Sequence, residues 1–133
     1  MLPAALDWLA AGCAPIPLST TGNKRPAVRW GDFLDAPPTE DEVRALFAAP
    51  TDGLAIICGA VSGGLEMLEF EGRAVQEHLV EQVTEAMGDN GLDNLWRRVL
   101  GGYAEQSPSG GLHLFYRVSD APASHNTKLA RRP

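Results

Sequence analysis

The sequence predicts an α+β fold in which a mixed or antiparallel sheet is flanked by helices. Apolar residues recur at helical spacing in several segments, and the short runs between them are apolar or alternating, as is typical of strands. Their order does not follow the regular alternation of a doubly wound parallel sheet. The length of 133 residues suits a single domain, which we place at residues 1–118, followed by a polar basic tail or linker at 119–133.

The N-terminal segment predicts a helix, an edge strand and a loop. Pro3 suits a first helical turn, the following apolar residues have helical spacing, and Gly12 suits the end of that helix. The apolar run Cys13–Leu18 is broken by two prolines, which is typical of an edge strand. Thr20–Arg29 is polar and contains Lys24, so we expect a basic loop there.

The middle of the chain predicts two strands and two further helices. Thr39, followed three residues later by Glu42, is the pattern of a capping box at a helix start. Leu54–Cys58 reads as a central strand covered on both faces, and we expect it to form a hairpin with Leu65–Glu71. Apolar residues at every fourth position then predict one helix over about Arg73–Met87.

The last third of the chain predicts a helix followed by two strands. The helix is expected over about Leu92–Leu100, and Tyr103–Gln106 reads as a short strand. The polar turn Ser107–Gly111 precedes the alternating strand Leu112–Val118. The remaining residues are polar and have no apolar periodicity, as in a linker or a frayed end.

The net charge of −6 is unevenly distributed along the chain. Residues 40–105 carry thirteen acidic and four basic side chains, whereas residues 106–133 carry one acidic and four basic ones. This acidic middle argues against binding nucleic acid through bulk positive charge, although it suits a site that concentrates divalent cations. Solvated helix faces account for most of these charges.

No apolar run approaches the ~20 residues that span a bilayer, and no signal peptide is present, so we expect a cytoplasmic protein without a membrane partner.

Two acidic residues stand at alternate positions near the end of the strand Leu65–Glu71. Side chains alternate between the faces of a strand, so Glu69 and Glu71 point the same way, ~7 Å apart. Two carboxylates this close repel each other unless a cation lies between them, and a hard divalent metal is the natural one. From the residues alone, a solvated strand face and a metal site both remain open, and solvated faces are the more common case.

His113 and the turn before it form a second candidate. A single histidine on a strand is more often a packed residue than a functional one. However, glycines such as Gly110 and Gly111 allow backbone amides to face an anion, and Ser109 adds a hydroxyl donor. This turn and His113 are therefore candidates for phosphate contact, and Lys24 is a weaker candidate in its own loop.

Taken in order, these segments resemble one protein family. They comprise a basic Lys-x-Pro loop (24–26), a capped helix, a Gly-x-x-Ser-Gly turn (59–63), the acid-x-acid strand, and a Ser-Gly-Gly-x-His strand (109–113). The sequence resembles the N-terminal domain of bifunctional DNA primase/polymerases in the archaeo-eukaryotic primase superfamily, especially the versions found on phages and plasmids. The resemblance covers nearly the whole chain, and the acid-x-acid strand followed by Ser-Gly-Gly-x-His is its most specific part.

The resemblance implies a nucleotidyltransferase, a DNA primase/polymerase acting in DNA replication. It implies Mg²⁺ or Mn²⁺ as cofactor, a DNA template and NTP or dNTP as substrates, and a helicase domain or protein as a further partner. Glu69 and Glu71 match the family's metal-binding acids and, with His113, its catalytic residues. The residues that match its nucleotide-binding positions are Ser109, Gly110, Gly111, His113 and Lys24.

The chain departs from the family pattern at two points. Position 69 is Glu where the pattern usually has Asp, and the family's third acid, which follows on a later strand, has no counterpart before Pro133. We therefore expect a primase-polymerase-like fold that is incomplete at its C-terminus and one metal ligand short. The alternative is a non-catalytic docking or binding domain of a replication module that retains the fold. A metal-dependent nuclease would leave the Ser-Gly-Gly-x-His turn without a role.

Overall fold

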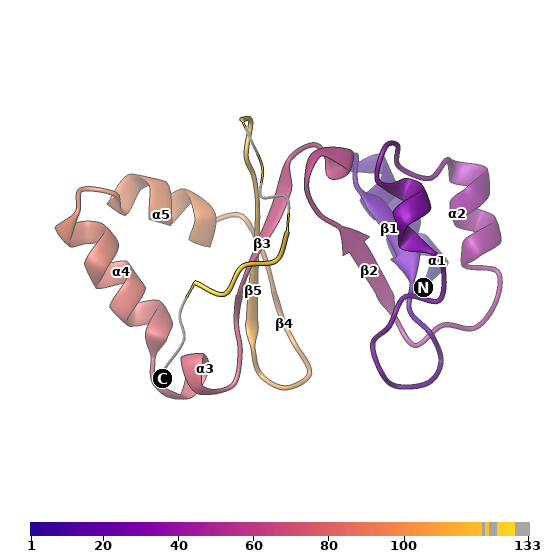
Figure 1. The fold of residues 1–133 in the computed structure, drawn as a ribbon. Coiled ribbons are helices and arrows are strands. Elements are labelled where there is room, and N and C mark those ends of the chain that lie inside the picture. The colour runs from indigo at the N-terminus through magenta and orange to yellow at the C-terminus, as the bar shows by residue number, and fades with distance from the viewer. Residues whose placement is uncertain (121, 123–124, 130–133) are drawn as a thin grey trace. The chain divides into compact units, whose positions relative to one another are not determined.

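The computed structural model describes residues 1–120, 122 and 125–129 and has the predicted mixed α+β architecture (Figure 1). The chain forms two compact units, which are described separately: unit 1 comprises Met1–Leu65 with Val118–Pro133, and unit 2 comprises Glu66–Arg117. The described residues of segment 119–133 include no helix or strand. The assignment of 1–118 to one domain and of 119–133 to a tail stays a prediction.

Unit 1 contains two helices and a two-stranded sheet. Its main elements are α1 (Leu2–Ala10), β1 (Ala14–Pro17), α2 (Glu40–Leu46) and β2 (Leu54–Ile57), with short 3-10 helices η1 (Trp30–Phe33) and η2 (Ala60–Ser62). β1 and β2 pair antiparallel, from Ala14 opposite Ile57 to Pro17 opposite Leu54. A strand with a single partner tolerates prolines, because one edge needs no amide donors.

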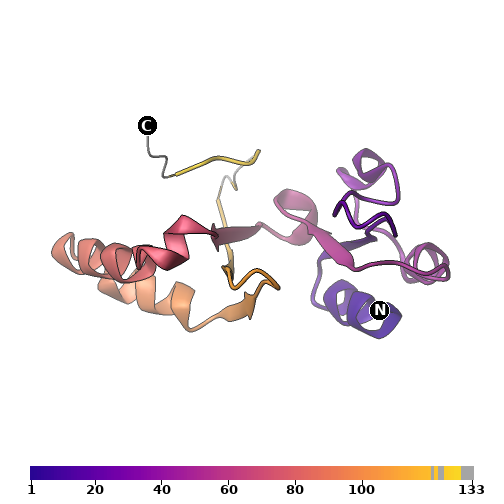
Figure 2. The same cartoon turned by 90° about the horizontal axis from the view of Figure 1, so that it is seen from below.

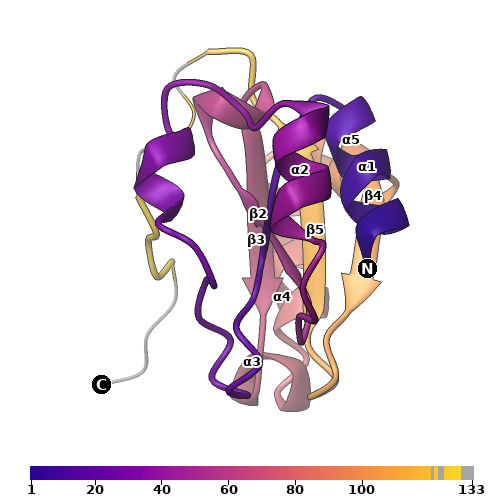
Figure 3. The same ribbon diagram turned by 90° about the vertical axis from the view of Figure 1, so that its right-hand side faces the viewer.

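One core cluster of unit 1 lies where α1 and α2 pack side by side (Figure 3), and a second is built from buried residues of β1 and β2. Ala5, Val43 and Phe47 are buried in the first cluster. The predicted capping box is confirmed: the Thr39 hydroxyl accepts a hydrogen bond from the amide of Glu42, and the Thr39 amide donates to the Glu42 carboxylate at 2.7 Å. The start of α2 is thus fixed by its own sequence.

Unit 2 consists of a three-stranded sheet and three helices. Its elements are β3 (Leu65–Phe70, which begins at the boundary), α3 (Arg73–Gln76), α4 (Leu79–Asp89), α5 (Asp93–Leu100), β4 (Tyr103–Gln106) and β5 (Leu112–Arg117). The strand order is β3-β5-β4, and β4 pairs antiparallel with β5. The three helices lie together on one side of this sheet (Figure 2).

The helices of unit 2 leave one sheet face free of helical cover. Phe70, Trp96 and Leu114 are buried between helices and sheet, with apolar residues of α4 and α5 around them. The Trp96 indole N–H donates to the hydroxyl of Thr84 at 2.7 Å, which ties α5 to α4. Since strand side chains alternate, the residues between these core positions face the other way.

The prediction of a hairpin between Leu54–Cys58 and Leu65–Glu71 is wrong. β2 pairs with β1, and β3 pairs with β5 in the other sheet. Between β2 and β3, η2 and three positive-φ glycines turn the chain, and an isolated bridge joins Gly59 to Leu65. The expectation of a central strand at 54–58 fails with it, because β2 has a single partner among the described strands.

The single helix expected over Arg73–Met87 is also wrong, because the chain breaks at His78. His78 has φ 55° and ψ 41°, a left-handed conformation that ends α3 after about one turn and precedes α4. Val75 remains 38% exposed, whereas Val83 and Met87 pack against the core. The spacing of these residues fits one continuous stripe, so periodicity alone does not reveal the break.

No helix among the described residues is long and apolar enough to cross a membrane.

Candidate metal and nucleotide site

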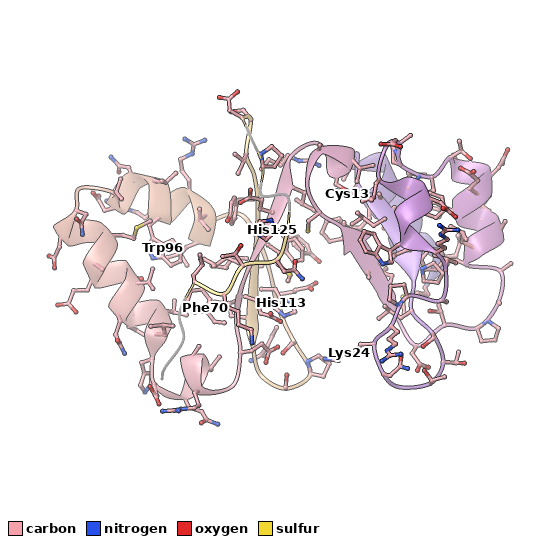
Figure 4. The ribbon with its side chains drawn as sticks, in the orientation of Figure 1. Cys13, Lys24, Phe70, Trp96, His113 and His125 are labelled. Atoms are coloured by element: carbon pink, nitrogen blue, oxygen red, sulfur yellow. The ribbon has the colours of Figure 1, made fainter. Side chains whose placement is uncertain are left out.

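The strand alternation places the candidate site on the sheet face that the helices leave free. Phe70 and Trp96 lie on the helix side of the sheet, and His113 lies on the opposite side (Figure 4). Glu69 is flanked in sequence by the core residues Leu68 and Phe70, and it points away from them, as the alternation predicts. Because β3 and β5 are neighbours, Glu69, Glu71 and His113 come together from two strands.

The three side chains converge on one point. His113 Nε2 lies 3.3 Å from Glu69 Oε1 and 3.6 Å from Glu71 Oε1. One ligand atom from each residue lies within 4.8 Å of the others. The His113 side chain is 17% exposed, whereas that of Glu69 is 50% exposed, so the cluster is accessible from the side of Glu69.

The donor set fits a divalent cation. His113 Nε2 is buried and has no hydrogen-bond partner, although both carboxylates lie at ion-pair distance from it. A buried polar atom without a partner is costly, and two carboxylates facing each other repel. A cation held by two carboxylate oxygens and an imidazole nitrogen would remove both costs, and this mixed O/N set suits Mn²⁺ and related divalent metals.

The turn before β5 holds Glu71 in place. The Ser109 hydroxyl donates to Glu71 Oε2 at 3.0 Å, and the hydroxyls of Ser107 and Ser109 are 2.9 Å apart. Hydrogen bonds from Ser107 and Ser109, with a smaller contribution from His113, hold the pKa of the Glu71 carboxyl below its usual value. Glu71 is therefore kept in the ionised form that a metal requires.

Glycine at position 111 makes room for this carboxylate. A Cβ atom built on Gly111 would collide with the carboxyl group of Glu71, so a side chain at that position would displace it. The turn also uses its own amides: Gly110 N donates to the carbonyl of Ser107, and Gly111 N donates to the Ser107 hydroxyl, both at 2.9 Å. Phosphate binding through these two amides would require them to exchange partners.

The predicted nucleotide-binding residues fall in both units. Ser109, Gly110, Gly111 and His113 lie in unit 2, beside the two acids. Lys24 belongs to unit 1, where it has a left-handed φ of 55° in the loop after β1. The nucleotide-binding roles of all five residues stay predictions.

Two further residues join the site that sequence reasoning did not single out. Ser107 shapes the turn, and Glu105 lies directly opposite His113 in the β4–β5 pairing. Glu105 Oε1 is 3.2 Å from His113 Nδ1, the ring nitrogen that points away from the other two carboxylates. Counting residues across the predicted turn between the two strands would have identified Glu105, since that count sets which residues face each other.

An α+β fold with two acids and a histidine on neighbouring strands is consistent with a metal-dependent enzyme of nucleic acids. The family model described as "Bifunctional DNA primase/polymerase, N-terminal" matches residues 5–133. The chain therefore belongs to this family, which confirms the resemblance drawn from its motifs. Membership indicates DNA primase/polymerase nucleotidyl transfer, with DNA and nucleotides as substrates. A comparison with curated proteins found no significant match.

Proposed function

We propose that this chain carries the metal-binding part of a template-dependent DNA primase/polymerase, in which Glu69 and Glu71 hold Mg²⁺ or Mn²⁺ and His113, beside them, is a catalytic and nucleotide-contacting residue. The observation that supports this most strongly is the buried, unpartnered Nε2 of His113 facing both carboxylates. A divalent cation held by Glu69 and Glu71 would supply activation of the attacking 3′ hydroxyl and stabilisation of charge on the transferred phosphoryl group.

The chain's own residues prepare the site. Ser107 and Ser109 keep Glu71 ionised, and Gly111 leaves space for its carboxylate. The exposed side of Glu69 leaves the cluster accessible to nucleotide and template. We propose Ser109, Gly110, Gly111 and His113 as nucleotide contacts. The role of Lys24, which belongs to unit 1, stays a prediction from the family resemblance. The helicase partner, the cytoplasmic location and the phage or plasmid origin stay predictions from the family resemblance.

Mn²⁺ binding and nucleotide incorporation together test the proposal. We expect Glu69→Ala, Glu71→Ala and His113→Ala each to weaken Mn²⁺ binding, measured by electron paramagnetic resonance (EPR) titration with dATP or ATP present. Each variant should also lose template-dependent incorporation of labelled nucleotide by about 100-fold or more, as expected for loss of electrostatic stabilisation. Glu85→Ala, on the exposed surface of α4, is the matched control and should behave as wild type.

Full incorporation by either glutamate variant would contradict the metal assignment. No nucleotide-dependent Mn²⁺ binding by the wild-type chain would instead favour the docking-domain alternative. Metal-dependent cleavage of single-stranded DNA without incorporation would identify a nuclease.

A further inference from the structure

Two aromatic residues lie on the helix-free face of the unit 2 sheet, next to the candidate metal site. Tyr103 of β4 lies directly opposite Phe115 of β5, and their rings pack edge to face with centroids 5.6 Å apart. This pair stands two residues along the strands from the Glu105–His113 pair, so alternation places it on the same face as His113 (Figure 4). Phe115 is 8% exposed and Tyr103 is 54% exposed, so Tyr103 is the ring of this pair that a ligand can reach.

Met67 of β3 extends this pair into a row. β3 and β5 are neighbours, and the amide of Val118, just after β5, donates to the carbonyl of Gly64, just before β3, at 2.9 Å. The start of one strand thus meets the end of the other, so the two strands are antiparallel. Counting three residues inward from this contact brings Met67 opposite Phe115. Met67 is exposed as well, and we call Met67, Phe115 and Tyr103 the apolar row.

The apolar row and the turn Ser107–Gly111 lie on opposite sides of the acidic site. Along β5 the turn comes first, His113 follows, and Phe115 comes ~7 Å further on. The turn and His113 are the proposed contacts of the incoming nucleotide. Phosphoryl transfer proceeds in line, so the leaving pyrophosphate and the attacking 3′ hydroxyl lie on opposite sides of the transferred phosphorus. With the pyrophosphate at the turn, the 3′ hydroxyl approaches from the side of the apolar row.

We propose that the apolar row binds the 3′-terminal nucleotide of the DNA strand that is extended, with the base of this nucleotide stacked on Tyr103. This inference rests on the proposed function, because the metal site sets where the 3′ hydroxyl must lie. Aromatic rings stack on unpaired bases of any sequence, and the flexible thioether of Met67 adapts to an irregular apolar surface. Arg117, an exposed residue two positions after Phe115 on β5, adds positive charge at this end of the sheet for a backbone phosphate.

Two substitutions at position 103 separate base stacking from packing of the hairpin. Tyr103→Ile keeps an apolar side chain that favours a strand but removes the ring, whereas Tyr103→Phe keeps the ring. Binding of a single-stranded oligodeoxynucleotide, labelled with fluorescein at its 5′ end, is measured by anisotropy at low salt in EDTA, so that no metal contributes. We expect Tyr103→Ile to bind about 10-fold more weakly, within the range for loss of one stacking ring, and Tyr103→Phe to bind like wild type.

Leu95→Ala is the matched control. It shortens an apolar side chain of α5 that is 51% exposed, close to the exposure of Tyr103, and it should bind the oligonucleotide like wild type. Thermal melts of the variants show whether each protein compared is folded.

A second oligonucleotide, which lacks only its 3′-terminal base, identifies the base that is stacked. Wild type should bind it about 10-fold more weakly than the intact oligonucleotide. Tyr103→Ile should bind the two equally, because the ring on which that base stacks is gone. A third oligonucleotide, which lacks one internal base, should bind wild type as the intact one does.

Wild-type affinity in Tyr103→Ile would overturn the inference. So would equal binding of the intact and 3′-abasic oligonucleotides by the wild-type chain, a comparison that needs no variant to fold. A loss confined to the internally abasic oligonucleotide would assign the row to the template strand and contradict the proposal. If Glu69→Ala and Glu71→Ala keep full incorporation, the proposed function fails, while the binding measured in EDTA still decides whether Tyr103 stacks on the terminal base.

Discussion

Glu71 is the residue on which most contacts of the candidate site converge. Its carboxylate accepts a hydrogen bond from Ser109, lies 3.6 Å from His113 Nε2, and occupies the space that glycine leaves at position 111. These contacts come from the turn and from β5, so the position of one carboxylate depends on three separate residues. Glu71 is therefore the most sensitive point of the site.

Ser107→Ala should raise the pKa of Glu71 towards its usual value. The hydrogen bond from Ser107 is the largest cause of the lowered pKa. A lowered folded-state pKa contributes stability above the unfolded-state pKa, and this contribution is lost as the pH falls through the folded-state value. The variant should therefore lose less stability on acidification than wild type does. A ¹³C NMR titration of the Glu71 carboxyl measures the shift, and an unchanged midpoint would refute the role of Ser107.

Gly111→Ala should weaken Mn²⁺ binding while leaving the fold intact. The added methyl group collides with the Glu71 carboxyl group, which is the flexible end of a side chain and can move away at low cost. The metal site would then lose one ligand. Isothermal titration calorimetry with Mn²⁺ and a thermal melt measure the two effects.

Gly88→Ala is the matched control for this substitution. A Cβ at Gly88 meets nothing within 4 Å, so Mn²⁺ binding should not change, and α4 should gain about 0.5–1 kcal/mol of stability. If Gly111→Ala binds Mn²⁺ like wild type, then moving the Glu71 carboxylate does not weaken the metal site, and the predicted role of Gly111 is wrong.

At the scale of single elements, the start of α2 is the feature that local sequence determines most completely. Thr39→Ala removes the hydroxyl that accepts from the Glu42 amide, and it should lower the free energy of unfolding by about 1 kcal/mol. Thr39→Ser keeps the hydroxyl and should restore most of the loss. Urea denaturation measures both variants, and equal stability of Thr39→Ala and wild type would contradict the capping role.

The same cap makes α2 sensitive to acid. The backbone and hydroxyl of Thr39 hold the pKa of Glu42 below its usual value, so the contribution of this carboxylate is lost as the pH falls through that lowered value.

Strand pairing is where sequence reasoning failed at this scale. The alternation within β3 and β5 correctly predicted that Glu69 and Glu71 share one face, away from Leu68 and Phe70, and that His113 points away from Leu114. It did not predict that β3 pairs with β5 rather than with β2, because pairing between distant strands depends on packing that no local pattern encodes. The break at His78 was missed for a related reason, since the left-handed residue interrupts an otherwise continuous apolar stripe.

For the molecule as a whole, the site residues Glu69, Glu71, Glu105 and His113 all belong to unit 2. The family and the α+β class were predicted from motif order and periodicity, and the family match confirms both. Glu105 was not singled out because its position opposite His113 follows from the register across the turn, and alternation within one strand does not give that register. The expectation that the site lacks the family's third acid stays a prediction from the resemblance.

The most direct test of the account is to locate bound Mn²⁺ by its paramagnetic broadening of NMR signals. The account predicts that substoichiometric Mn²⁺ broadens the signals of His113, Glu69 and Glu71 first, and that Glu71→Ala abolishes this selectivity. Val43→Ala, which opens the buried core of unit 1, should lower stability by about 2 kcal/mol yet preserve the broadening pattern. Broadening that follows the exposed acids of α4 and spares His113 would contradict the central claim.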